Sequence, residues 1–123
     1  MSLPKYLLWF IGGFTVFFGL TFVFMPHYFF EMYTGGKFPT TSAAIDVRST
    51  YGGFSLGMGL FLFWCSKNNI RAGLTAALLA LACIIPARIL GLLVDGSPNN
   101  NMFLFLGLEV VSLLAVLLAL RKK

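Results

Sequence analysis

Four apolar runs, each long enough to cross a bilayer, constrain the fold of this chain more than any other feature. They cover residues 6–25, 43–65, 72–94 and 102–120, and short polar or aromatic segments separate them. A transmembrane helix needs about 20 predominantly apolar residues to span the hydrocarbon core. We therefore predict an all-α fold, a polytopic membrane protein built as a four-transmembrane-helix bundle, with residues 1–123 forming one domain.

The composition favours a membrane protein over a soluble domain. Hydrophobic residues make up 59% of the chain and charged residues 11%, and the mean hydropathy is +0.88. Soluble domains are roughly 25% charged. The first run has no small-residue cleavage site after it, so we expect a retained helix rather than a signal peptide.

The positions of the basic residues predict the topology. If both termini lie on one side of the membrane, that side holds Lys5, Lys67, Arg71, Arg121, Lys122 and Lys123. The opposite loops hold only Lys37, within an aromatic segment that we expect at headgroup level. The positive-inside rule then predicts a multi-pass protein of the inner membrane with both termini in the cytoplasm. Because the bases lie at the ends of apolar runs, we expect no nucleic-acid partner.

Ionisable residues interrupt three of the apolar runs at a similar depth. At a helical rise of 1.5 Å per residue, Arg48 lies about 8 Å inside the second run, Arg88 about 9 Å inside the third and Glu109 about 10 Å inside the fourth. Asp46 lies nearer the surface, about one turn into its run. The sequence therefore predicts a polar cluster in the outer leaflet.

Helical periodicity places this cluster toward the interior of the bundle. Arg48 shares a helix face with Gly52, Ser55 and Gly59, and the first run carries a stripe with Gly12 and Gly19. Small residues of this kind mark close helix contacts in membranes, so we predict that these five residues mediate helix packing. 

The partners within the cluster follow from depth and direction. Asp46 and Arg48 are two residues apart and point nearly opposite ways, so they do not pair. We expect Glu109 to be the partner of Arg48, and Arg88 to share Glu109 or to reach Asp95. Tyr51 either hydrogen-bonds a carboxylate or ligand, or anchors the helix at the interface.

Three interpretations of this cluster remain open at the level of the sequence. Inserting a charged side chain near the middle of a membrane costs about 2.5–3.5 kcal/mol of free energy. We therefore expect the cluster to have a structural or functional role. It fixes helix register as a structural network, or its surplus positive charge binds an amphipathic anionic or carbonyl ligand such as a lipid or quinone. In the third interpretation Glu109 acts in proton-coupled transport or catalysis.

The remaining residues indicate no known chemistry. Cys65 and Cys83 lack metal-ligand spacing, His27 is an isolated interfacial histidine, and no nucleophile triad or phosphate loop is present. We expect no catalytic residue, metal or cofactor. The favoured function is a binding or accessory module, and the alternative is a structural or assembly subunit. The expected partners are membrane lipid, a hydrophobic small-molecule ligand, and either a second copy of the chain or a larger membrane complex.

Three segments resemble one family of small bacterial membrane proteins. They are DVRSTYGG at residues 46–53, ARILGLLVDG at residues 87–96, and Glu109 within the last run. Together they resemble the family catalogued as domain of unknown function 4345, over nearly the whole chain. The resemblance implies four membrane helices and names no substrate. In general shape the chain is also similar to DoxX-like four-helix proteins, an analogy that carries no function.

Overall fold

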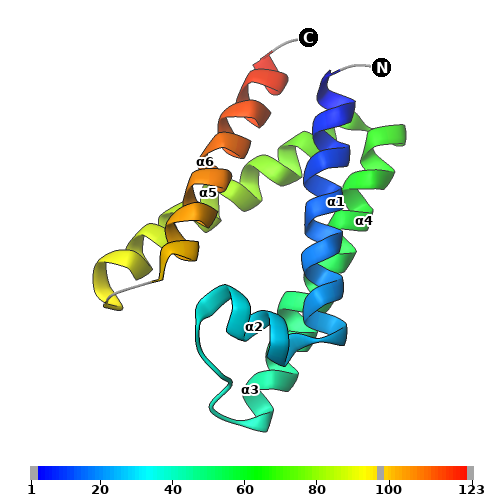
Figure 1. Cartoon of the computed structure of the whole chain (residues 1–123). Coiled ribbons are helices and arrows are strands. Elements are labelled where there is room, and N and C mark those ends of the chain that lie inside the picture. The colour runs from blue at the N-terminus through cyan, green and yellow to red at the C-terminus, as the bar shows by residue number, and fades with distance from the viewer. Residues whose placement is uncertain (1–2, 97–98, 122–123) are drawn as a thin grey trace.

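The computed structural model describes residues 3–96 and 99–121, and all regular secondary structure within them is helical. The elements are α1 (Leu3–Phe24), α2 (Pro26–Thr34), α3 (Thr41–Asp46), the π-helix η1 (Val47–Gly53), α4 (Phe54–Asn68), α5 (Ile70–Val94) and α6 (Asn100–Arg121) (Figure 1). Over this part of the chain, α1, α5 and α6 are the helices long and apolar enough to cross a membrane. The predicted all-α class is confirmed, with membrane-length helices.

The second apolar run differs from the single α-helix predicted over residues 43–65. It is divided among α3, η1 and α4, and α4 alone has 15 residues. The Ser49 and Thr50 hydroxyls donate to the carbonyls of Ile45 and Asp46, at 2.9 and 2.6 Å. Hydroxyls that bond to the preceding turn in this way disturb an α-helix. The two glycines that end η1 also have weak helix propensity, so the wider π turn forms here.

Local capping sets the other helix boundaries. Pro26 starts α2 at the position where its missing N–H costs nothing, and Gly35 ends α2 in the left-handed conformation with φ 84°. Thr40 and Asn69 cap the N-termini of α3 and α5, and their side chains accept from the amides of Ala43 and Ala72. Asn69 is also the residue that follows α4, so α4 and α5 meet in a tight turn.

The closest helix contact joins α1 to α4 and η1. A Cβ atom added at Gly19 would lie 2.5 Å from the Leu56 amide nitrogen, and one added at Gly59 would lie 2.7 Å from the Gly12 carbonyl oxygen. Similarly, a Cβ at Gly52 would lie 2.9 Å from the Val23 nitrogen. These glycines therefore let the two backbones approach closely, as small residues do in membrane helix pairs.

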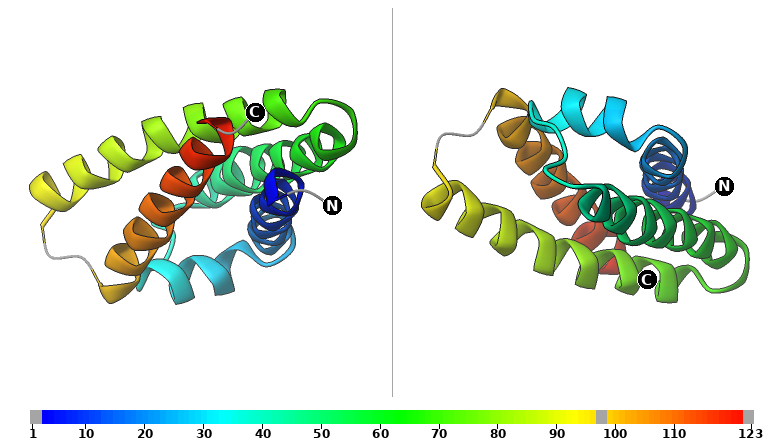
Figure 2. Two further views of the ribbon diagram at one scale, coloured as in Figure 1. Left: turned by 90° about the horizontal axis from the view of Figure 1, so that it is seen from above. Right: turned by 90° about the horizontal axis from the view of Figure 1, so that it is seen from below.

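The helices form two antiparallel hairpins, α1 with α4 and α5 with α6, which diverge toward the end that carries α2 and α3 (Figure 1). The hydrophobic core lies at the opposite end, where all four helices meet. Its buried members are Leu8, Leu62, Cys65, Leu74, Ala77, Val116 and Ala119. Views along the molecule show α2 beside the start of α6 (Figure 2). The diverging ends are therefore joined by other contacts, described below.

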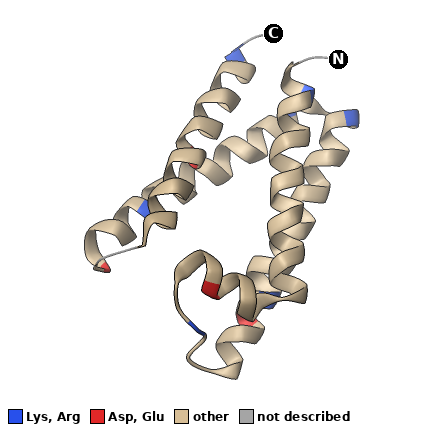
Figure 3. Ribbon diagram, viewed as in Figure 1, with Lys and Arg blue, Asp and Glu red and all other residues tan. Residues whose placement is uncertain are grey.

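Basic residues gather at the end of the molecule that holds both chain ends (Figure 3). Lys67 lies in the last turn of α4, Arg71 in the first turn of α5 and Arg121 at the end of α6. The N- and C-terminal ends of the described chain also lie together there (Figure 1). The fold therefore brings four of the bases counted in the topology prediction, Lys5, Lys67, Arg71 and Arg121, to one end. Lys122 and Lys123 lie outside the described residues.

Replacing Gly19 by Ala will test the α1–α4 contact. The added methyl group would meet the backbone of Leu56 and the Gly52 carbonyl, so the helices must separate. We expect a loss of about 1–3 kcal/mol in unfolding free energy. Gly57→Ala is the matched control because a Cβ there meets nothing within 4 Å. Thermal unfolding in detergent measures both variants, and equal stability for the two would contradict the proposed contact.

Candidate functional site

The candidate site is an ion pair between α5 and α6. Arg88 Nε and Nη2 donate to Glu109 Oε1 and Oε2 at 2.7 and 2.8 Å, a bidentate arrangement. The two residues meet because α5 and α6 are antiparallel neighbours and each carries its charge at a similar distance from the connecting turn. A fork of this kind fixes the orientation of both planes and gives strong, charge-assisted hydrogen bonds.

Two further contacts surround the guanidinium. Arg88 Nη1 lies 3.6 Å from the sulfur of Met102, and the guanidinium carbon lies 5.5 Å from the centre of the Phe105 ring. An arginine placed over an aromatic face gains a cation–π attraction. The side chains remain 25% and 17% exposed for Arg88 and Glu109 respectively. The charges of the pair therefore cancel, and Met102 and Phe105 contact a guanidinium that remains partly exposed.

An aromatic cluster centred on Tyr33 continues from Phe105 and joins the diverging hairpins. Ring centres lie 4.9 Å from Tyr33 for Phe18, 5.7 Å for Phe22 and Phe29, and 5.9 Å for Phe105. These rings come from α1, α2 and α6, at separations that favour tilted or edge-to-face pairs. We call this group the Tyr33 cluster. It links α1 and α2 to α6, and Phe105 also contacts the Arg88 guanidinium.

Two asparagines attach the start of α6 to the end of α2. The Asn99 and Asn101 side-chain amides each donate to the Tyr33 carbonyl at 3.2 Å, and Asn101 also reaches the Met32 carbonyl at 3.1 Å. These acceptors belong to the last turn of α2, whose carbonyls have no partner within the helix. Asn99 and Asn101 therefore tie the start of α6 to the helix that carries Tyr33.

Arg48 lies apart from this ion pair, which corrects the expected contact with Glu109. Its guanidinium donates instead to the carbonyl of Val23, in the last turn of α1. That carbonyl lies where α1 breaks before Pro26, and a cation near a helix C-terminus is favoured by the helix dipole. The physical reason is packing, because η1 lies against α1 while the hairpin that carries Glu109 diverges from it. Arg48 therefore serves as a capping group for α1.

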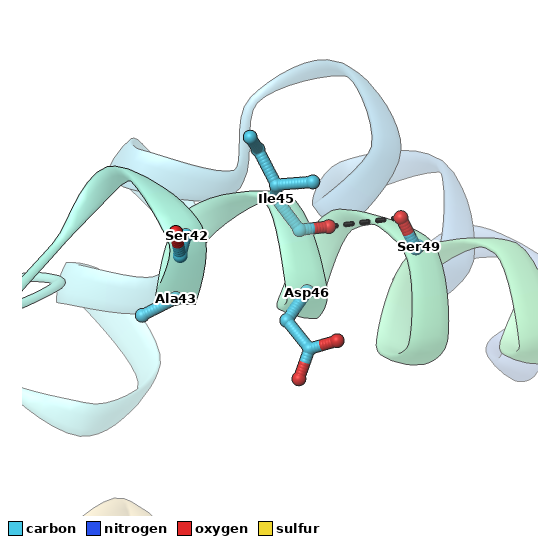
Figure 4. A pocket seen from close by; sticks show the side chains of 5 residues that line it. All are labelled: Ser42, Ala43, Ile45, Asp46 and Ser49. Carbon is cyan, nitrogen blue, oxygen red and sulfur yellow. Dashed lines mark hydrogen bonds between the residues drawn. The ribbon is translucent and has the colours of Figure 1, made fainter.

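Asp46 and Tyr51 also lie outside the ion pair. Both are exposed, and the Tyr51 ring packs edge-on against Phe22 with centres 5.7 Å apart. Asp46 lines an open pocket of about 440 Å³. Figure 4 shows the side chains that line it, with the Asp46 carboxylate pointing away from the ribbon. The lining residues are Ser42, Ala43, Ile45, Asp46 and Ser49. The five residues predicted to form one cluster thus divide into the Arg88–Glu109 pair, the Arg48 cap on α1, the exposed Asp46 carboxylate and Tyr51, whose ring packs on Phe22.

The predicted packing residues lie mainly at the α1–α4 contact. Gly12, Gly19, Gly52 and Gly59 are buried there, and Ser55 is partly buried. Cys65 is buried, Cys83 is exposed, and the described residues hold no cluster of three or more His, Cys, Asp or Glu side chains that suits a metal.

Sequence reasoning missed the Tyr33 cluster, the asparagine contacts and the π-helix. The available signals were the dense aromatics of residues 28–33, the Asn99–Asn101 run and the Ser-Thr pair before Gly52.

A double-mutant cycle on Arg88 and Glu109 will measure their coupling. Either Arg88→Met or Glu109→Gln leaves its partner without a counter-charge in apolar surroundings, so each should lower the unfolding free energy by about 3 kcal/mol, the lower end of the cost for a buried pair because both side chains are partly exposed. The double variant should lose less unfolding free energy than the two single variants lose together, because neither charge remains in it. Denaturant unfolding in detergent gives the coupling energy, and strict additivity would show that the pair has no structural role.

Loss of the Arg48 cap should loosen the end of α1. Arg48→Met removes the donor to the Val23 carbonyl while keeping the apolar stem. We expect faster amide exchange in a peptide that covers residues 18–28, measured by mass spectrometry. Lys67→Met, which removes an exposed base at the other end of the molecule, is the control. Unchanged exchange in the Arg48 variant would contradict the capping role.

Comparison with known proteins supports the resemblance noted in the sequence. No curated protein and no solved structure matches the chain significantly. The likeness to DoxX-like proteins accordingly stays a prediction. A family model, in contrast, matches residues 3–120, which confirms the predicted family. The chain belongs to the family described as domain of unknown function (DUF4345).

Proposed function

We propose that this protein crosses the inner membrane four times with both termini in the cytoplasm. The support for a fourth crossing is the unbroken helical path of α3, η1 and α4, residues 41–68. At about 1.5 Å per residue this path exceeds the roughly 30 Å of a hydrocarbon core. The gathering of bases beside both chain ends supports the cytoplasmic orientation.

Within this topology, we propose a structural or assembly role rather than catalysis. The observation that carries the proposal is the bidentate Arg88–Glu109 pair, whose charges cancel and whose remaining guanidinium nitrogen faces Met102. Because the two side chains are already paired and their charges cancel, they are better suited to holding α5 and α6 together than to reacting with a substrate. The Arg48 contact with Val23 serves the same purpose at the end of α1.

The outer surface of the bundle is compatible with this role. Leu104, Val111 and Leu118 recur every seven residues along α6 and are 57%, 65% and 61% exposed. Such spacing places them on one face. In a membrane this face lies against lipid or against another subunit, because water would oppose so large an apolar stripe.

A second candidate function is the binding of an amphipathic ligand at the same ion pair. It is favoured by the remaining exposure of Arg88 and Glu109, 25% and 17%, beside the Phe105 ring. A quinone-like carbonyl or an anionic lipid headgroup would accept from the exposed guanidinium edge. The aromatic wall would then pack against the apolar part of the ligand.

Native mass spectrometry of the purified protein separates the two candidates. An assembly role predicts a defined complex, either of several copies of the chain or with a partner protein. A folded Arg88→Met, Glu109→Gln double variant should form the same complex. A binding role predicts a retained small molecule that this double variant loses. A monomer without any retained molecule in several mild detergents would contradict both functions.

The orientation has a separate test. We expect single cysteines introduced at positions 37 and 67, in a background without Cys65 and Cys83, to label from opposite sides of the membrane. Position 67 should react with membrane-impermeant reagents only after the cells are opened, because its end of the molecule carries most of the bases. Labelling of both positions from outside would exclude the four-span topology.

A further inference from the structure

A second hollow lies beside α2, away from the ion pair. It measures about 470 Å³, and its lining residues are His27, Tyr28, Glu31, Lys37 and Phe38. We call it the α2 hollow. Small-molecule sites are commonly about 300–1,000 Å³, so a lipid headgroup fits the size of this space.

One face of α2 and the chain segment that follows Gly35 form the α2 hollow. His27 and Glu31 are four residues apart in α2, so they lie on one face. The left-handed Gly35, whose amide donates to the Glu31 carbonyl at 2.8 Å, then reverses the chain direction. Phe38 thereby returns to stack on Phe30, with ring centres 4.2 Å apart, and meets His27 edge-on at 5.2 Å.

The hollow also lies where a lipid headgroup would be. α2 begins two residues after α1, a membrane-length helix, has ended at Phe24. Three large side chains beside this junction are strongly exposed: Phe24 at 73%, Met25 at 53% and Tyr28 at 56%. Aromatic and apolar side chains at the end of a span are typical of the interface between headgroups and acyl chains.

The charges around the hollow have both signs. Lys37 supplies an ammonium group, His27 an imidazole, Tyr28 a hydroxyl and Glu31 a carboxylate. A phosphate accepts from the first three groups, whereas an ammonium donates to the carboxylate. This combination matches a zwitterionic headgroup with a phosphate and a primary amine.

We propose that the α2 hollow binds the headgroup of a phosphatidylethanolamine-type phospholipid, with its phosphate on Lys37 and His27 and its ammonium on Glu31. The proposal rests on the membrane placement given under the proposed function. Glu31 provides the selectivity. A choline headgroup has no N–H to donate to this carboxylate, and a glycerol headgroup has no positive charge to offset it.

The test uses the full-length protein and native mass spectrometry with phosphatidylethanolamine, phosphatidylcholine and phosphatidylglycerol of identical acyl chains. We expect phosphatidylethanolamine to be retained about threefold to fivefold more than the others, the range that an exposed charge pair supports. Glu31→Gln should abolish this preference, and Lys37→Gln should weaken binding of all three lipids. Lys67→Gln, at the opposite end of the molecule, is the matched control.

Several outcomes would overturn the proposal. Equal retention of the three lipids, or an unchanged preference in Glu31→Gln, removes the role of the carboxylate. Displacement of the lipid by millimolar free phosphoethanolamine would assign the hollow to a soluble phosphate ester instead. Thermal unfolding confirms that each variant is folded, and Lys37→Gln provides an independent test if Glu31→Gln is not. The cysteine-labelling result reports topology alone, so a failure of the membrane placement is distinguishable from a failure of this site.

Discussion

Polar groups within the apolar body must find their partners inside the protein, because hydrocarbon offers none. The rest of the structure depends on this constraint. Arg88 and Glu109 satisfy each other, Arg48 satisfies a carbonyl at the broken end of α1, and the Trp9 indole donates to Ser66 at 2.8 Å. Among the residues described, no buried side-chain nitrogen or oxygen lacks a hydrogen-bond partner. Three of the charges that interrupt the apolar runs, Arg48, Arg88 and Glu109, thus support the helix arrangement.

Different kinds of interaction hold the helices together at the two ends of the molecule. At the end with the chain termini, a small aliphatic core brings all four long helices together, while close glycine contacts join α1 to α4 and η1 along their length. At the other end the hairpins diverge, and the Tyr33 cluster, the ion pair and the asparagine contacts connect them. Long side chains can make these ring, ion-pair and hydrogen-bond contacts even where the helix backbones are too far apart to pack closely. The proposed lipid site in the α2 hollow lies at this second end, where fewer apolar side chains are buried.

Much of the architecture was predictable from local patterns. Run length predicted the long helices, the four-residue spacing predicted the face with Gly52 and Gly59, and depth counting placed Arg88 level with Glu109. The contact of Arg48 with Val23 was not predictable in this way. Depth alone leaves several acceptors within reach of a long side chain, and the choice depends on which helix η1 packs against.

By itself, the sequence determined the helical class, the membrane-length runs, the close-packing glycines and the position of basic residues at helix ends. These properties follow from composition and short-range periodicity, which act within one helix at a time. Only the tertiary structure decided the separate partners of Arg48 and Arg88 and the assembly of the Tyr33 cluster. Each of these depends on the relative placement of helices distant in the chain, and local propensity carries no information about that placement.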